Sequence, residues 1–246
     1  MNSQHDKNVS LTRRDFIKVT GTILLVAGLG DQPARAEGAS QGCTLPGQFL
    51  LQADGIPPAD GYLLVDIAKC QGCMSCMLAC SLIHEGVESL SLSRIQIMQD
   101  SFASFPDDLT IEQCRQCVDP ACVTICPTGA LAADPDSGNV RIVDKEACIG
   151  CGLCFQACPF TPSRAVLAPD DEYDGQAKSR KCDLCTNAPF HWVAAGGGPG
   201  GQQACVAVCP VGAILFTDEI PEQDGDSGYR VNLRDEVWGI LGYPTS

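Results

Sequence analysis

The residues of this 246-residue chain that can do the most chemistry are its 17 cysteines, sixteen of which fall into four groups of four. In the stretch CIGCGLCFQACPF, Cys148, Cys151, Cys154 and Cys158 follow a C-x2-C-x2-C-x3-C spacing, and Pro159 comes next. The other groups are Cys70, Cys73, Cys76 and Cys80; Cys114, Cys117, Cys122 and Cys126; and Cys182, Cys185, Cys205 and Cys209. Because the same group recurs along the chain, one kind of thiol chemistry must explain all four.

Three kinds of chemistry use cysteine at such density. Disulfides suit exported proteins, but cysteines separated by two residues seldom meet disulfide geometry. Zinc ribbons use two C-x2-C pairs per site, which leaves the compact third thiol and the x3 step unexplained. The compact run followed by proline is typical of bacterial ferredoxins, in which four thiolates hold each [4Fe–4S] cluster. The spacing therefore favours four [4Fe–4S] clusters, with zinc and disulfides as the alternatives.

The spacing has a physical reason. Three thiols on a tight loop reach three corners of one cluster, and Gly72, Gly150 and Gly152 allow the backbone angles that such a loop needs. The fourth thiol lies a short turn later and, in two-cluster ferredoxins, ligates the other cluster. The first group has Ser81 where the others have proline, so we expect a different turn there with the same ligand spacing.

Residues 1–36 have the pattern of a twin-arginine (Tat) export signal. Arg13 and Arg14 precede the uncharged stretch 19–30, and Ala34-Arg35-Ala36 forms a cleavage site. The Tat translocase carries folded cargo, which suits a protein whose clusters are inserted before export. We therefore expect a periplasmic protein; an uncleaved signal that serves as a membrane anchor is the alternative. Cys43, just beyond, is expected to be a free thiol in a linker over residues 37–60.

Residues 62–216 resemble the four-cluster iron–sulfur subunits of dimethyl sulfoxide reductase type complexes. The matching stretches are KCQGCMSCMLAC, CRQCVDPACVTICPTGAL, CIGCGLCFQACPF and KCDLC…ACVAVCPVGAI. The x4 spacing in the second group and the long gap in the fourth are specific to that family. Relatives serve polysulfide reductases, formate dehydrogenases, hydrogenases and cytochrome nitrite reductase systems. SCMLACSLIHEG and LSLSRIQIM are also similar to the branch that serves tungsten aldehyde oxidoreductases.

The resemblance implies an α+β fold of two interleaved bacterial-ferredoxin-like modules within residues 61–218. Residues 113–165 would form the inner module, residues 61–100 with 180–218 the outer module, and residues 219–246 a docking tail. The implied ligand sets are Cys70, Cys73, Cys76 and Cys209; Cys182, Cys185, Cys205 and Cys80; Cys114, Cys117, Cys122 and Cys158; and Cys148, Cys151, Cys154 and Cys126.

The resemblance also implies a non-catalytic subunit that relays single electrons through four [4Fe–4S] clusters. Its partners would be a molybdenum- or tungsten-pterin catalytic subunit, or a hydrogenase, and a quinone-linked membrane subunit or cytochrome. A free-standing periplasmic carrier and a non-redox structural metal protein are the competing hypotheses. The chain shows no Ser/His/Asp set or paired-carboxylate site, and its formal charge of −14 argues against binding nucleic acid.

The strand pattern agrees with such a fold. Strands are expected over residues 62–67, over SRIQIMQ and over GAILFTD, and a turn over residues 136–139 should lead into a further strand.

Several residues near the cysteine groups are candidates for secondary roles. Lys69, Arg115, Lys145 and Lys181 adjoin ligands, and either raise cluster potentials or balance an acidic surface. His84 is expected to be a surface or capping residue. His191 and Trp192 are expected to cover a cluster or lie in an interface, next to a flexible glycine-rich loop over residues 194–203.

Overall fold

The computed structural model describes residues 55–104, 107–243 and 245. The chain separates into two units, residues 1–47 and 48–246, and every element described below belongs to the second unit. The predicted export signal, Cys43 and most of the predicted linker lie outside the described residues.

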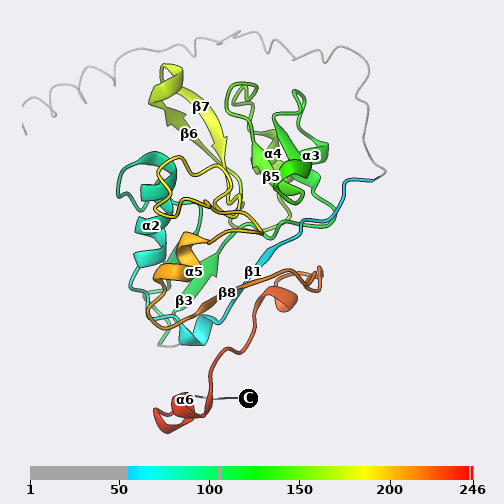
Figure 1. Ribbon diagram of the computed structural model, residues 1–246. Coiled ribbons are helices and arrows are strands. Elements are labelled where there is room, and N and C mark those ends of the chain that lie inside the picture. The colour runs from blue at the N-terminus through cyan, green and yellow to red at the C-terminus, as the bar shows by residue number, and fades with distance from the viewer. Residues whose placement is uncertain (1–54, 105–106, 244, 246) are drawn as a thin grey trace, which may run out of the picture. The chain divides into compact units, whose positions relative to one another are not determined.

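Eight short strands form four separate antiparallel pairs among the described residues (Figure 1). The first and last strands of the chain pair with each other, and the remaining pairs are hairpins of consecutive strands. The pairs are β1 (Tyr62–Val65) with β8 (Ile214–Thr217), β2 (Gln96–Gln99) with β3 (Leu109–Glu112), β4 (Leu131–Asp134) with β5 (Val140–Val143), and β6 (Val166–Asp170) with β7 (Gln176–Arg180).

The strands expected at both ends of the cysteine-rich region are confirmed, and their pairing explains how distant cysteine groups meet. Tyr62 lies opposite Thr217, and Val65 lies opposite Ile214. This pairing brings the first and fourth groups together, although more than a hundred residues separate them. The first strand is shorter than expected, because the Asp66 side chain accepts a hydrogen bond from the Lys69 N–H and so starts a 3-10 helix.

Short helices contain five of the sixteen grouped cysteines. The α-helices are α2 (Ser75–Glu85), α3 (Ala121–Thr124), α4 (Leu153–Ala157), α5 (Ala204–Val208) and α6 (Glu236–Ile240), and the 3-10 helices are η1 (Ile67–Lys69), η2 (Pro135–Ser137), η3 (Asp171–Tyr173) and η4 (Ser227–Tyr229). Helix α2 packs against α5, and α3 packs against α4. Helices α2 and α5 fall within the residues predicted for the outer module, and α3 and α4 fall within those predicted for the inner module.

The hydrophobic core is small and is built around thiols. In one cluster, Leu63, Val65, Ile97 and Ile111 are buried with six cysteines, which are Cys70, Cys76, Cys80, Cys114, Cys182 and Cys205. In the inner module, Leu131 is buried against Cys154. A chain with so few large apolar side chains therefore places its cysteines where an ordinary domain places leucine and phenylalanine.

The hairpin of β6 and β7 was not expected from the sequence. It joins the predicted inner module to the second segment of the predicted outer module, residues 180–218. Its turn contains Asp174 and Gly175, both in the left-handed region at φ 53° and 75°. Its second strand ends at Arg180, so it delivers the chain directly to Cys182.

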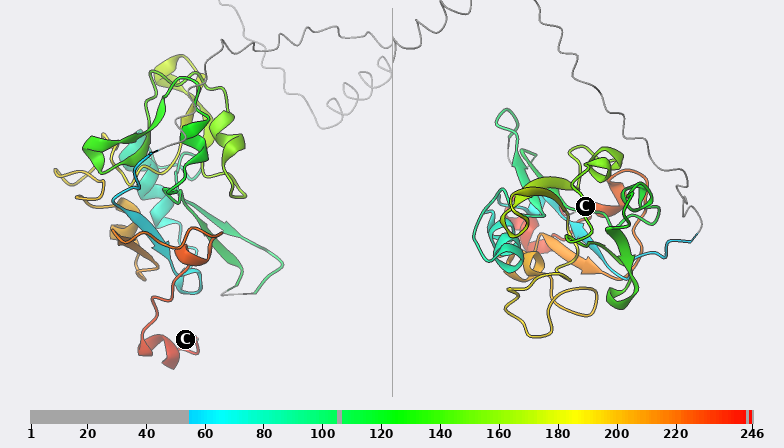
Figure 2. Two further views of the ribbon diagram at one scale, coloured as in Figure 1. Left: turned by 90° about the vertical axis from the view of Figure 1, so that its right-hand side faces the viewer. Right: turned by 90° about the horizontal axis from the view of Figure 1, so that it is seen from above.

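The folded unit continues beyond Asp218, where the docking tail was expected to begin. Tyr229 is only 1% exposed, and its hydroxyl donates to the Arg115 carbonyl at 2.8 Å. Only α6 stands apart from the folded body, in Figure 1 and in the left view of Figure 2. No helix within the described ranges is long and apolar enough to cross a membrane.

Candidate iron–sulfur sites

Four cavities in the described region are each lined by four grouped cysteines. Their empty volumes lie between about 290 and 400 Å³. We number them site I (Cys70, Cys73, Cys76, Cys209), site II (Cys80, Cys182, Cys185, Cys205), site III (Cys114, Cys117, Cys122, Cys158) and site IV (Cys126, Cys148, Cys151, Cys154). Each cavity thus holds the four thiols that the family resemblance assigns to one cluster, and their ligation of a cluster stays a prediction.

The helices explain why each cysteine group serves two sites. Cys76 and Cys80 lie four positions apart in α2, so they share one helix face at a rise of about 6 Å. Cys76 faces site I and Cys80 faces site II. Helix α5 contains Cys205, which faces site II, and Cys209 follows at its C-terminal end and faces site I. Helices α3 and α4 likewise contain Cys122 and Cys154, and Cys126 and Cys158 follow just beyond their ends and face the other site of the pair.

The first C-x2-C pair of each group adopts the same turn. The residue before the second cysteine is in the left-handed region in every group: Gly72 at φ 64°, Gln116 at 48°, Gly150 at 69° and Leu184 at 53°. Glycine occupies this position without steric cost, whereas glutamine and leucine incur about 1–2 kcal/mol. The Gln116 amide offsets that cost by donating to the Cys182 carbonyl and accepting from a backbone N–H. Sequence patterns identified only the glycine members of this set.

Each site takes three thiols from one cysteine group and the fourth thiol from another group. The sulfur of each of these fourth cysteines accepts a hydrogen bond from a backbone N–H. The donors are Arg94 to Cys80 at 3.4 Å, Leu131 to Cys126 at 3.4 Å, Arg164 to Cys158 at 3.3 Å and Ala213 to Cys209 at 3.2 Å. Such bonds stabilise negative charge on sulfur and so favour the thiolate that binds iron.

The thiols lie in an environment that opposes their ionisation unless a cation compensates. Burial, reinforced by repulsion from neighbouring cysteines of the same site, raises the pKa of Cys76 to about 12 and of Cys117 to about 11. Cys73 and Cys80 are exceptions. A hydrogen bond to Ser75 lowers the pKa of Cys73 at the surface. At Cys80 burial acts to raise the pKa, but the hydrogen bond and the charge of His84 outweigh it and lower the pKa. Four thiols crowded into an apolar pocket in this way suit a positively charged iron–sulfur core.

The remaining features of the cavities also fit a cluster. All sixteen cysteines of the described ranges are free thiols, so none is used in a disulfide there. Within the same ranges no three or more His, Cys, Asp or Glu side chains are gathered as a single metal ion requires. The thiols are instead spread around a cavity, as four ligands of a larger group would be.

The sites follow one another in numerical order. Cys205 of site II is close enough to Cys76 of site I for their charges to interact, and Cys182 of site II is equally coupled to Cys114 of site III. Sites III and IV share helices α3 and α4. The two cysteines classed as exposed, Cys73 and Cys151, belong to sites I and IV, so the series opens to solvent at both ends.

His84 was expected at the surface or as a helix cap, and the structure corrects this. The side chain is buried, with Nε2 at 3.0 Å from Asp183 and Nδ1 at 2.7 Å from the Cys80 carbonyl and 3.7 Å from the Cys80 sulfur. Burial alone lowers its pKa, but these hydrogen bonds outweigh burial and raise it to about 9. The i, i+4 spacing from Cys80 was the available sequence signal, since it puts both residues on one helix face.

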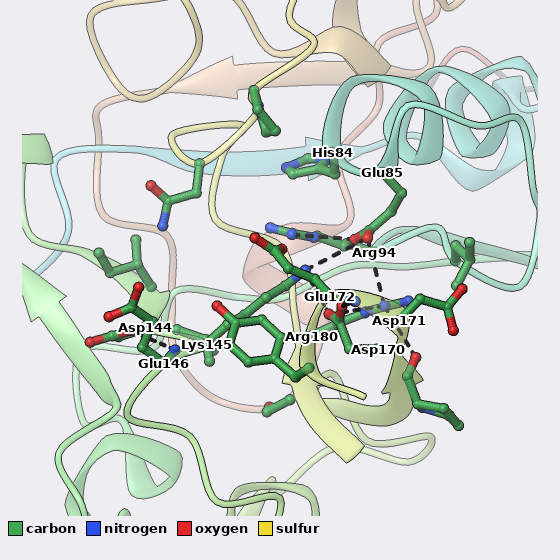
Figure 3. A pocket seen from close by; sticks show the side chains of 18 of the residues that line it. His84, Glu85, Arg94, Asp144, Lys145, Glu146, Asp170, Asp171, Glu172 and Arg180 are labelled. Carbon is green, nitrogen blue, oxygen red and sulfur yellow. Dashed lines mark hydrogen bonds and ion pairs between the residues drawn. The ribbon is translucent and has the colours of Figure 1, made fainter. Parts of the chain in front are cut away.

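Lys145 lies in a charged cleft and not against a cluster site. Its ammonium pairs with Asp170 at 2.9 Å and with Glu85 at 3.6 Å, and Arg180 reaches the same two carboxylates. Figure 3 shows these side chains meeting in the cleft with Arg94 beside them. Because the opposite charges pair with one another, the cleft is a seam of ion pairs, and Lys145 balances acidic groups there.

The other predicted cations differ in placement. Lys69 donates to the Leu233 carbonyl at 2.8 Å and lies over the Trp238 ring, so it holds the C-terminal segment. Arg115 and Lys181 are buried beside site III. His191 and Trp192 both bond to Gln202 and line none of the four sites.

Comparison with known proteins agrees with this geometry. Residues 107–219 match the family described as "4Fe-4S dicluster domain", and residues 67–83 match "4Fe-4S binding domain". The electron transport protein HydN of Escherichia coli K12 is 31% identical over 64% of this chain and 87% of its own length. The polyferredoxin-like subunit of the aliphatic sulfonate oxidoreductase of Pyrococcus furiosus is 36% identical over 60% of this chain and 70% of its own.

The chain belongs to this family of ferredoxin-like 4Fe–4S proteins. The hydrogenase-2 operon protein HybA of Escherichia coli O157:H7 is also similar, at 29% identity over 84% of this chain. The match spans 62% of HybA, so about two fifths of that protein has no counterpart here.

Proposed function

We propose that this chain is a periplasmic electron-transfer subunit with four [4Fe–4S] clusters, one at each site. The observation that carries the proposal is the sorting of sixteen thiols from four cysteine groups into four cavities of four. Such a cluster accepts and gives back one electron at a time. The chain's own residues hold it: thiolates ligate, backbone N–H groups offset charge on sulfur, and apolar side chains exclude water.

The order of the sites supports a relay from one end of the described unit to the other. Sites I and IV each have one exposed cysteine, whereas the four cysteines of site II are all buried. Electrons would therefore enter and leave at sites I and IV and pass through sites II and III. Two interleaved modules produce this arrangement, because each helix pair contributes ligands to two adjacent sites.

The partners belong to the proposal as well. Similar proteins are named as products of hydrogenase operons and as subunits of oxidoreductases, which supports a catalytic subunit at one end of the relay. We propose a molybdenum- or tungsten-pterin enzyme of the dimethyl sulfoxide reductase type, or a hydrogenase, as that partner. A quinone-linked membrane subunit or a cytochrome would serve the other end, and the Tat translocase would export the loaded protein.

Metal analysis of the native protein tests the proposal. The protein is isolated from its own host without oxygen, and Fe, Mo, W and Zn are measured per chain. We expect about sixteen iron atoms, four for each of four clusters, with molybdenum or tungsten in the co-purifying partner. Iron alone would support a free-standing carrier or a hydrogenase partner. Zinc with little iron would refute electron transfer by this chain.

A further inference from the structure

The four sites differ in the charge of their surroundings. Four cationic side chains line the cavity of site III, and each is at most 7% exposed; they are Arg115, Arg141, Arg164 and Lys181. Cysteines aside, the cavities of sites I and IV are lined by no ionisable side chain, and site II has only His84 and Arg94. Of the four cavities, that of site III is therefore lined by the most cationic side chains.

Two of the four cations at site III have their own counter-ions. Arg115 pairs with Asp226 at 2.6 Å, and Arg164 pairs with Glu112. Each of these ion pairs is close to neutral as a unit, so it contributes little net charge to the site.

Arg141 and Lys181 have only carbonyl partners. The Lys181 ammonium donates to the carbonyls of Arg141 and Cys182, and the Arg141 guanidinium donates to those of Asn139 and Cys117. Within the described ranges neither side chain lies in an ion pair with a carboxylate.

A carboxylate in the surroundings of Lys181, that of Asp183, does not supply the missing charge. Asp183 interacts with Lys181 electrostatically, but its oxygens are already paired with Arg94 at 2.6 Å and with His84 at 3.0 Å. Carbonyl dipoles do not neutralise a full charge, and a buried cation without a counter-charge is costly. Two buried positive charges therefore require an anion beside them.

We propose that Arg141 and Lys181 are counter-ions of the cluster at site III, which gives this site the highest reduction potential of the four. The proposal rests on the proposed function, which places a cluster there. Four thiolates outweigh the charge of the core they hold, so the group is a net anion. Accepting one electron from a donor adds one negative charge and changes no bond, and two uncompensated cations stabilise that charge.

The thiols of site III are coupled to Lys181. Burial raises the pKa of Cys122 to about 12, and Lys181 is the strongest influence in the opposite direction. Arg141 likewise interacts with Cys114, Cys117 and Cys122. An electron that enters the series from either end would therefore settle at site III, inside the protein and one step from site IV.

An anaerobic redox titration with dithionite, followed by electron paramagnetic resonance, tests this on the full iron-loaded chain. Lys181→Met and Arg141→Met each remove a charge and should lower the highest midpoint potential, while Lys181→Arg should preserve it. Lys178→Met is the matched control, because Lys178 is equally buried and donates to the Cys148 carbonyl beside site IV. It should leave the highest midpoint unchanged and lower a different one.

Several outcomes would overturn the inference. An unchanged highest midpoint in both charge-removing variants would do so, as would a highest midpoint that falls only in Lys178→Met. An equal fall in Lys181→Arg and Lys181→Met would show that charge is not the cause. Iron is counted in every preparation: a parent chain without reducible iron refutes the proposed function itself. If one methionine variant does not load iron, the other and Lys181→Arg still decide.

Discussion

Asp183 should be the most sensitive non-cysteine position for the stability of the fold. Its carboxylate is completely buried and accepts hydrogen bonds from Arg94 at 2.6 Å and His84 at 3.0 Å, and from the backbone N–H groups of Cys185 and Asn187. The opposite charges of Arg94 and His84 hold its pKa far below the usual range, against the effect of burial. Asp183→Asn preserves the size of the side chain and removes the charge.

The size of the effect follows from what the substitution leaves behind. Arg94 and His84 stay buried, with 8% and 1% of their side chains exposed, and lose the carboxylate that pairs with both, which leaves Arg94 only the longer ion pair with Glu85 at 3.7 Å. Breaking a buried ion pair by removing one partner costs about 3–5 kcal/mol. In a protein of this size 1 kcal/mol corresponds to roughly 2–4 °C in Tm, so Tm should fall by about 6–20 °C.

The assay is thermal unfolding of the iron-loaded protein without oxygen, followed by circular dichroism at a fixed scan rate. Asp171→Asn is the control, because it makes the same chemical change at an exposed position in the cleft that His84 and Arg94 line. The control should shift Tm by less than about 2 °C, since surface substitutions usually change stability by under about 0.5 kcal/mol. If Asp183→Asn with full iron content unfolds within 2 °C or so of the parent, the network does not stabilise the fold as argued.

Three further changes test other parts of the structure. Cys209→Ser should remove or convert the cluster of site I and spare that of site II, as iron content and resonance spectra would show; damage confined to site II would contradict the arrangement. Gly150→Ala should cost more stability than Gly129→Ala: both glycines have positive φ, but only at Gly150 would the new methyl group collide with the Ala177 carbonyl. Tyr229→Phe should lower Tm by a few degrees, because the buried carbonyl that loses its hydroxyl donor costs about 1–3 kcal/mol; an unchanged Tm would show that water replaces the bond.

Spacing in the sequence was enough to predict the kind of site and several strands. The strands before the first cysteine group and after the fourth are confirmed, and so is the turn over residues 136–139, where η2 leads into β5. These features depend on local chemistry: alternating apolar residues, turn-forming Asp and Gly, and thiols at fixed intervals. The ligand sets came from the family resemblance, because spacing alone does not tell which distant thiols share a cavity.

What the sequence did not predict depends on tertiary contacts. Gln116 and Leu184 adopt a left-handed conformation that their residue types disfavour, because the surrounding structure holds them there. His84 looked like a surface residue until its partner Asp183, 99 positions away, was placed beside it. The hairpin of β6 and β7 was missed because its first strand contains a proline, which lowers strand propensity.

The helix turn is the unit that makes four sites possible in so short a chain. Cysteines at positions i and i+4 of a helix project from one face about 6 Å apart. At this distance the two thiols reach two neighbouring cluster sites. In α2 both cysteines lie within the helix, and in the other three groups the second cysteine lies at or just beyond the end of a short helix. Two such segments packed together supply four thiols, two for each of two sites, and the neighbouring C-x2-C turns complete the sets. A single cysteine shifted by one residue would point to another face of its helix, which is why the x3 interval recurs in all four groups.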